Sequence, residues 1–255
     1  MKPRLLLAAT ALCVAVPGTV YAQGVDEFGP YGGLEERGHL DSPQKNAFEL
    51  RVGPYLPNVD DGVDGTPFAD VFGSKNRYLL GLELDWQLLR IPMFGTLGPG
   101  VGVGYTVISA KAPFADPATA PEGRSDQKTN LQILPAYAVG VLRADVLARE
   151  TVVPLAAYAK AGLGYALWWA KGEDNLERAN GVVGKGVSYG YNLAVGAMFL
   201  LDALDRRGAV EMDSATGINN AYLFIEYYVS NLDGFGGDKM QVGTNTWMAG
   251  LALEF

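Results

Sequence analysis

The residues of this chain that could take part in chemistry are a few charged side chains that alternate with apolar or small ones. Glu83 and Asp85 form a carboxylate pair of the kind that acid–base catalysis uses, because one carboxyl can donate a proton while the other accepts one. They are two positions apart, so in an extended segment both side chains lie on the same face. The full set of such charged residues is Glu49, Arg51, Glu83, Asp85, Lys160, Glu226 and Glu254.

The single histidine, His39, argues against hydrolytic chemistry. Many hydrolases and acyltransferases use a histidine to activate a nucleophile or a water molecule. His39 lies in a stretch rich in Gly, Pro and charge that precedes every candidate acid. We therefore predict that the chain is not an enzyme, that it has no catalytic residue and no cofactor, and that its charged side chains pair with one another in a structural role.

Three stretches look like ligand-binding motifs but lack the required spacing. The segment 98–105 (GPGVGVGY) has Val103 where a dinucleotide fingerprint needs its third glycine, and Gly184-Lys185 has no glycine five positions before it. The segment 60–65 (DDGVDG) has glycine where a calcium loop needs a ligand. We predict no nucleotide or metal site, and read 60–65 as a solvated acidic loop.

The composition indicates a β protein that does not bind nucleic acid. The net charge is −8, whereas nucleic-acid-binding domains carry a basic face. Hydrophobic residues make up 49% of the chain, with 33 Gly, 13 Tyr, 10 Phe and 4 Trp. No apolar run after residue 22 approaches the ~20 residues of a membrane-spanning helix, so this apolar content favours strands.

The first 22 residues predict a cleavable secretory signal peptide. A basic start with Lys2 and Arg4 is followed by the apolar run 5–16 and by small residues at the expected cleavage site after Ala22. The apolar run is too short for a membrane anchor. Cleavage removes Cys13, the only cysteine, so we expect no disulfide in the exported protein.

Segments of alternating apolar and polar or small residues follow residue 45 and are separated by turn-forming residues. Most odd-numbered connections between them are long and polar, and most even-numbered ones are shorter, as in transmembrane barrels. The sixth connection, 201–219, departs from this rule and predicts a short helix near 200–213. The pattern leaves eight or ten strands open, and we count eight, at 47–56, 77–89, 98–110, 129–142, 154–170, 186–200, 220–230 and 245–255.

The two faces of these segments predict a barrel that is apolar outside and polar inside. One face carries large apolar residues, and the other carries Gly and Ala beside the single charges. A water-facing strand surface would carry more Lys, Thr, Ser and Glu, whereas small residues beside charges fit a narrow barrel interior. The predicted fold is therefore an all-β, eight-stranded antiparallel transmembrane β-barrel; a soluble sandwich is the alternative. In the segment 129–142 the face expected to meet lipid comprises Leu131, Ile133, Tyr137, Val139 and Val141.

Aromatic residues recur near the ends of the predicted strands, as in the interfacial girdles of membrane barrels. If the N-terminus of the barrel lies in the periplasm, Trp86 and Phe255 mark the inner interface. The residues predicted at the outer interface are Tyr55, Tyr78, Trp168, Trp169, Tyr189, Tyr191, Tyr227, Tyr228 and Trp247.

The last ten residues, TWMAGLALEF, together with the export signal and the alternating segments, resemble the small outer-membrane β-barrels of Gram-negative bacteria, of OmpX-like or OmpW-like shape. The segments 78–92 and 218–236 resemble a poorly characterised outer-membrane barrel family of myxobacteria. The resemblance implies a signal peptide (1–22), a periplasmic linker (23–45) and an outer-membrane barrel (46–255). It also implies a C-terminal signal for the barrel-assembly machinery, formed by Trp247, Leu251, Leu253 and Phe255.

The function expected of such a chain is a structural or surface-interaction role through long extracellular loops, at 57–76, 111–128, 171–185 and 231–244. Its expected partners are outer-membrane lipid, lipopolysaccharide and, during biogenesis, the assembly machinery, and we expect a monomer. One alternative is a conduit or binder for small hydrophobic molecules; others are a soluble exported ligand-binding barrel and, less favoured, an outer-membrane enzyme. The residues that could line an apolar conduit are Tyr158, Tyr222, Phe224 and Tyr228.

Overall fold

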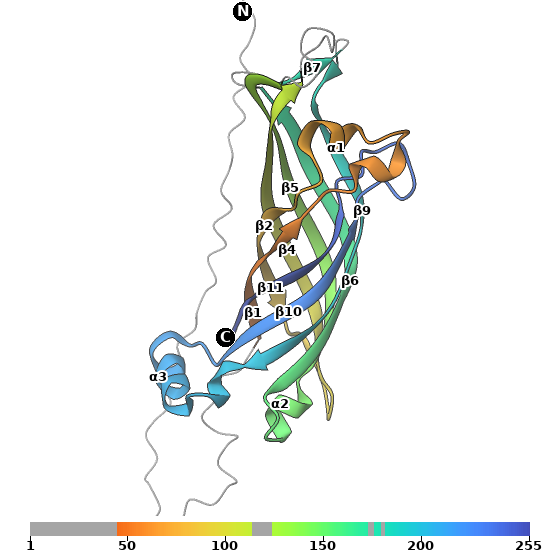
Figure 1. Cartoon of the computed structure of the whole chain (residues 1–255). Helices are drawn as coiled ribbons and strands as arrows, with labels where there is room; N and C mark the ends of the chain where they lie inside the picture. Colours follow the sequence, from red (N-terminus) through yellow and green to blue (C-terminus); the bar gives the residue numbers. More distant parts are fainter. Residues whose placement is uncertain (1–44, 114–123, 173–175, 180–181) are drawn as a thin grey trace, which may run out of the picture. The chain divides into compact units, whose positions relative to one another are not determined.

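The computed structural model describes residues 45–113, 124–172, 176–179 and 182–255, and these residues form a closed antiparallel barrel of eight long strands (Figure 1). The predicted signal peptide and all of the predicted linker except Lys45 lie outside the described residues. The barrel strands are β1 (Asn46–Tyr55), β2 (Arg77–Trp86), β4 (Gly95–Pro113), β5 (Arg124–Ala144), β6 (Leu155–Lys171), β9 (Lys185–Leu200), β10 (Asn220–Asn231) and β11 (Thr244–Glu254).

Each long strand pairs with the next long strand along the chain, and the pairing of β1 with β11 closes the barrel. The sheet order is β2-β1-β11-β10-β9-β6-β5-β4, and β2 also pairs with β4. At the seam between the chain ends, Asn46 and Phe255 exchange backbone hydrogen bonds of 2.9 and 3.0 Å. The described residues therefore contain eight barrel strands. The shorter strands are β3 (Leu89–Ile91), which pairs with β4, and the hairpin of β7 (Arg178–Ala179) and β8 (Val182–Val183).

The predicted alternation of an apolar outer face and a polar inner face is confirmed in the segments that carry the candidate charges. In β6, for example, Leu163 and Tyr165 are exposed while Tyr158 and Lys160 are buried. Such alternation is what a strand gives when successive side chains point to opposite faces of the sheet.

The face prediction is wrong for β5. Leu131, Ile133, Val139 and Val141 are buried inside the barrel rather than exposed to lipid, while Ala138 and Gly140 lie on the outer face. Small outer residues and large inner ones reverse the pattern of the other strands. For Leu131 and Ile133 the physical reason is that they belong to an apolar cluster in the outer half of the interior, as described below.

We define the inner end of the barrel as the end that holds Asn46 and Phe255, and the outer end as the opposite one. The outer connections carry the 3-10 helix η2 (Val59–Gly62) and the helix α1 (Pro67–Phe72). The inner connections carry α2 (Val146–Glu150), the 3-10 helix η3 (Leu201–Ala203) and α3 (Arg206–Thr216) (Figure 1).

The helix predicted near 200–213 is confirmed as α3, although it begins and ends later. It starts after Asp205, whose carboxylate accepts hydrogen bonds from the backbone N–H groups of Arg207 and Gly208, both 3.1 Å long. It ends at Gly217, whose φ of +73° is the left-handed conformation of a glycine that terminates a helix. None of the described helices is both long and apolar enough to cross a membrane.

Candidate functional site: a buried ion cluster in the barrel interior

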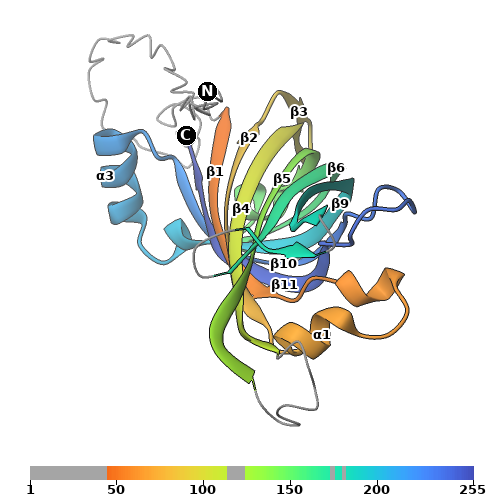
Figure 2. The same ribbon diagram turned by 90° about the horizontal axis from the view of Figure 1, so that it is seen from above.

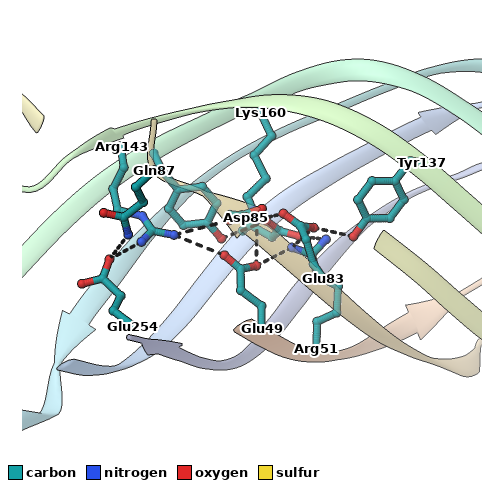
Figure 3. Close-up of polar contacts among 11 residues, drawn as sticks. Glu49, Arg51, Glu83, Asp85, Gln87, Tyr137, Arg143, Lys160 and Glu254 are labelled. Atoms are coloured by element: carbon teal, nitrogen blue, oxygen red, sulfur yellow. Dashed lines mark hydrogen bonds and ion pairs between the residues drawn. The ribbon is translucent and has the colours of Figure 1, made fainter. Parts of the chain in front are cut away.

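The seven charged side chains that the sequence placed inside the barrel are all buried, and they lie in one connected cluster of ion pairs (Figure 3). They come from five strands: β1, β2, β6, β10 and β11. The alternation of each strand turns its charges inward, and the closure of the barrel then brings the strands opposite one another.

Arg51 links three acids from three strands. Its guanidinium nitrogens lie 2.7 Å from Glu49, 2.8 Å from Glu83 and 3.1 Å from Glu226. The same guanidinium lies 5.7 Å from the ring centroid of Tyr137. This arrangement uses the planar fork of donors that distinguishes arginine from lysine.

Lys160 reaches from the opposite wall to two of the same acids. Its Nζ atom donates to Glu49 Oε2 at 2.7 Å and to Glu83 Oε1 at 2.5 Å. Glu83 also accepts a hydrogen bond of 2.5 Å from the hydroxyl of Tyr137. Both carboxylate oxygens of Glu83 are therefore engaged, which compensates for the loss of hydration on burial.

Arg143 is the third cation of the cluster, and the sequence analysis missed it. It pairs closely with Glu254, and its other terminal nitrogen lies 3.5 Å from both Glu49 and Asp85. The predicted strand ends at residue 142, whereas β5 continues to Ala144. Parity alone could not place it inside, because Arg143 shares the odd positions of Tyr137, and the sequence predicts that this face meets lipid.

Hydrogen bonds from neutral side chains complete the cluster. The hydroxyl of Tyr158 donates to Glu226 at 2.8 Å, and Gln87 and Asn220 donate to Glu254 at 2.7 and 3.1 Å. These contacts place Tyr158, one of the residues proposed to line an apolar conduit, in a polar role. Tyr137, which the sequence pattern predicts on the lipid-facing side, instead lies inside the barrel and donates its hydrogen bond to Glu83.

Interior glycines provide the space that these long side chains occupy. A β-carbon added at Gly81 would lie 2.9 Å from Cγ of Arg51, and one at Gly102 would collide with the ring of Tyr137. A narrow eight-stranded barrel has room inside only for side chains, so large residues on one wall require small ones on the facing wall. The glycine-rich segment 98–105, which resembles a nucleotide motif, has this packing role.

Acids outnumber bases in the described cluster. Five carboxylates face three cations, so two negative charges are uncompensated when every carboxylate is ionised. Asp85 is the least engaged acid. Within the described residues neither of its oxygens accepts a hydrogen bond, and the ion pair with Arg143 at 3.5 Å is long.

Glu49, Glu83 and Asp85 are the described residues that come nearest to a metal site, with one carboxylate oxygen of each within 4.8 Å of the others. Lys160 and Arg51 already occupy this region, however, and they contact the carboxylates of Glu49 and Glu83. A divalent cation would have to displace these side chains or approach them closely. We therefore assign no metal to the cluster.

The outer half of the interior is filled by apolar side chains instead of charges. Phe68 of α1 is buried there with Leu131 and Ile133 of β5. The remaining buried members of this apolar cluster are Tyr55, Leu79, Ile108, Ala166, Ala194, Tyr228, Leu232, Val242 and Met248. Tyr55, Tyr228 and, in part, Trp168 thus lie inside, which corrects their predicted place in an outer aromatic girdle.

Two connections fold over the outer mouth of the barrel. The connection between β10 and β11 is held by Ser188, whose hydroxyl donates to the carbonyl of Met240 at 2.6 Å, and by Tyr55, which donates to the carbonyl of Val242. Asp60 accepts hydrogen bonds from the backbone N–H groups of Phe68 and Ala69 at 2.7 and 3.0 Å. Asp60 thus anchors α1, a role that the prediction of a purely solvated acidic loop had not included.

The outer surface between the two ends is apolar around the barrel. The exposed side chains include Leu82 and Val103 on one side and Leu223 and Ile225 on the other. A water-soluble barrel buries such residues, whereas a barrel in lipid exposes them and encloses its charges. The chain is a membrane-spanning β-barrel. Barrels of this kind occupy the outer membrane of Gram-negative bacteria.

Three residues of the predicted assembly signal, Trp247, Leu251 and Leu253, lie on β11, and Phe255 directly follows it. Trp247 and Phe255 are exposed, Leu251 and Leu253 are half-buried, and Met248 and Glu254 are buried. Trp247 packs edge-on against Tyr227, with ring centroids 5.3 Å apart. This placement agrees with lipid-facing aromatic residues, while recognition by the assembly machinery stays a prediction.

Comparisons with known proteins concern the fold. No protein-family model matches the sequence, and neither does any curated protein. Among solved structures, the outer membrane protein OprG from Pseudomonas aeruginosa is 11% identical with a TM-score of 0.45, over 84% of this chain and 97% of that chain. Ail, the attachment invasion locus protein of Yersinia pestis, in complex with the heparin analogue sucrose octasulfate, is 14% identical with a TM-score of 0.41, over 83% and 97%. The N-terminal β-barrel domain of Pseudomonas aeruginosa OprF is 12% identical with a TM-score of 0.35, over 84% and 100%.

Proposed function

We propose that this protein is a sealed outer-membrane barrel that stabilises the envelope and presents its outer connections to the cell surroundings. In this proposal, residues 1–22 direct export and are removed, and the inner end of the barrel faces the periplasm. The observation that carries the proposal is the filled interior, with an ion cluster at one level and an apolar cluster at the next.

The ion cluster makes a transport function through the inner half unfavourable. A path through this level has to separate buried partners such as Lys160 and Glu83, and breaking a buried ion pair costs about 3–5 kcal/mol. Several such pairs share the same cross-section. The cluster therefore supports a rigid structural role rather than passage of solutes.

The outer connections supply the surface that a partner could contact. The β1–β2 connection contains η2 and α1, and β4 and β5 extend beyond β1 and β2 at the outer end (Figure 1). In that extension Lys111 and Asp126 are exposed and pair at 3.1 Å. Lipid, lipopolysaccharide and surface ligands are the partners that we propose, with the barrel acting as a monomer.

The proposal is tested with planar bilayers and protease shaving. The purified barrel in a planar bilayer should give no steady conductance, and a variant in which Lys160 is replaced by Ala should show more open events than the parent protein. Protease added to intact cells should cut within 57–76, 111–128 or 231–244 and spare the inner connections. Steady conductance by the parent protein, or cleavage confined to the inner connections, would contradict the proposal.

A second candidate function is binding of a small hydrophobic molecule in the outer half of the interior. The apolar cluster around Phe68 favours it, because an apolar ligand could replace this ring if α1 moved outward. Replacing Phe68 by Ala should then increase binding of an apolar fluorescent probe. Unchanged probe binding would favour the sealed barrel over the binding of a small hydrophobic molecule.

A further inference from the structure

Among the residues that the structure describes, the apolar surface of the barrel continues past the inner ends of the strands on one side only. Trp86, the last residue of β2, pairs with Asn46, which is hydrogen-bonded to Phe255, so Trp86 and Phe255 lie at the same level of the wall. Beyond that level the hairpin of β3 and β4 continues for three more residue pairs, from Leu89–Leu97 to Ile91–Gly95. At about 3.4 Å per residue this extension is roughly 10 Å long.

The extension is apolar where a turn in water is usually polar. Met93, at its tip, has a left-handed φ of 58°, and its side chain is 85% exposed. Beside the hairpin, the connection that contains α2 exposes 96% of Val152. Turns in water favour Gly, Asn, Asp and Ser, and a large exposed apolar patch marks an interaction surface. The other exposed apolar residues of this sector are Leu88, Leu89, Ile91, Phe94, Leu147 and Val153.

The opposite side of the inner end is different. There the connection between β9 and β10 carries α3, whose sequence RRGAVEMDSAT is mostly polar or small. Figure 2 shows α3 and β3 on different sides of the barrel. Leu204 and Val210 of this connection are 73% and 68% exposed, but they stand singly among charged residues such as Asp205 and Arg207. Single exposed apolar residues are ordinary on a surface in water.

The charged side chains of the β3–β4 hairpin and the α2 connection are compatible with a position at the boundary between the acyl chains and the head groups of a membrane. Arg90 lies 3.5 Å from Asp145, so its charge is paired. Together with Met93 and Glu150 these residues line a depression of about 300 Å³ between the hairpin and α2. A long arginine side chain can keep its stem in an apolar layer while its head reaches polar groups.

We propose that the β3–β4 hairpin and the α2 connection are immersed in the interfacial layer of the lipid leaflet at the inner end, while α3 stays in water. The argument is continuity: Val101 of β4 is exposed on the apolar outer surface, β4 runs unbroken into the hairpin, and the one charged residue of the hairpin, Arg90, is paired with Asp145. Interfacial elements bury their apolar face about 5–10 Å into this layer, a depth comparable to the extension. The barrel then sits asymmetrically in the membrane.

The test is spin labelling of the full chain reconstituted in phospholipid vesicles. Cys13 is the only cysteine, so a Cys13→Ser background allows single-cysteine variants. Met93→Cys and Val152→Cys report on the apolar sector, and Leu204→Cys and Val210→Cys are matched controls of similar exposure. Folding of each variant is checked by its migration in SDS gels before and after boiling. Collision rates with oxygen, which partitions into lipid, are compared with those of a water-soluble nickel chelate.

The expected result is a ratio of oxygen to nickel collisions several-fold higher at Met93→Cys and Val152→Cys than at the two controls. Equal ratios at all four sites would overturn the proposal, whether they indicate water or lipid. Low collision rates with both reagents at positions 93 and 152 would also overturn it, because they indicate a protein covering rather than lipid. The inference rests on the barrel spanning a membrane and not on the proposed surface role, which the shaving and conductance experiments test separately.

Discussion

Glu49 on β1 and Glu83 on β2 are directly opposite residues of two paired strands, and Lys160 from β6 joins them. The register pairs Glu49 with Glu83, and Nζ of Lys160 lies 2.7 Å from the first carboxylate and 2.5 Å from the second. Two like charges directly opposite in a sheet are destabilising by themselves. Lys160 comes from the opposite wall and pairs with both carboxylates, so it links β6 to β1 and β2 across the interior.

Replacing Lys160 by Met should therefore destabilise the barrel strongly. The variant leaves the carboxylates of Glu49 and Glu83 with one cation fewer, and uncompensated buried charge typically costs about 3–5 kcal/mol. The measurement is urea unfolding of the refolded protein, followed by the gel shift between the folded and boiled forms. Met conserves the length of the side chain, so a loss below about 1 kcal/mol would show that Lys160 does not hold the cluster together.

Replacing Asp85 by Asn should raise the free energy of unfolding or leave it unchanged. The cluster has two more carboxylates than cations, and neither oxygen of Asp85 accepts a hydrogen bond from a described residue. Removing one negative charge while keeping the shape reduces the repulsion within the cluster. The same urea measurement should give equal or higher stability, whereas a loss of more than about 2 kcal/mol would mean that Asp85 is an essential partner of Arg143.

Gly102→Ala should destabilise the barrel, while Gly140→Ala should not. A β-carbon at Gly102 would collide with the ring of Tyr137, whereas one at Gly140 would meet only the carbonyl oxygen of Ala161 at 3.8 Å. Overpacking of this kind costs about 1–3 kcal/mol. The two variants add the same methyl group, so similar melting temperatures would refute the role of Gly102 as space for Tyr137.

Asp60→Ala should loosen α1 at the outer mouth. The carboxylate of Asp60 accepts hydrogen bonds from two backbone N–H groups at the start of α1, and losing a charged acceptor of this kind costs about 1–3 kcal/mol. The rate of proteolysis within 57–76 should rise several-fold. Asp61→Ala is the control, because Asp61 is exposed and should leave the rate unchanged.

Phe255→Asp should impair assembly far more than Met248→Ala. Phe255 closes the seam with Asn46 and is expected to mark the inner interface, where its ring meets lipid. Met248 faces the interior, so its truncation affects packing rather than recognition of the last strand. The yield of folded protein in the outer-membrane fraction distinguishes the two, and equal yields would contradict an assembly signal at the C-terminus.

The sequence predicted the interior residues correctly where the pattern within a single strand is sufficient to assign the inner face. Glu49, Glu83 and Glu226 could be placed inside because alternation is local and period two needs no knowledge of the partner strand. Tyr137 and Arg143 were missed for a related reason. On β5 the large apolar residues face inward, so hydrophobicity alone assigned the wrong face, and only packing against Phe68 and the other walls reveals the reversal.

The sequence by itself determined the strand class and the identity of seven interior charges, because both depend on patterns within a few residues of one segment. The tertiary structure decided which cation meets which acid, since Arg143 and Glu254, like Lys160 and Glu49, are 111 residues apart in the chain. It also decided that the interior is filled. That outcome depends on the register of all eight strands around a closed circle, where a one-residue shift of any strand would turn the interior charges of that strand toward lipid.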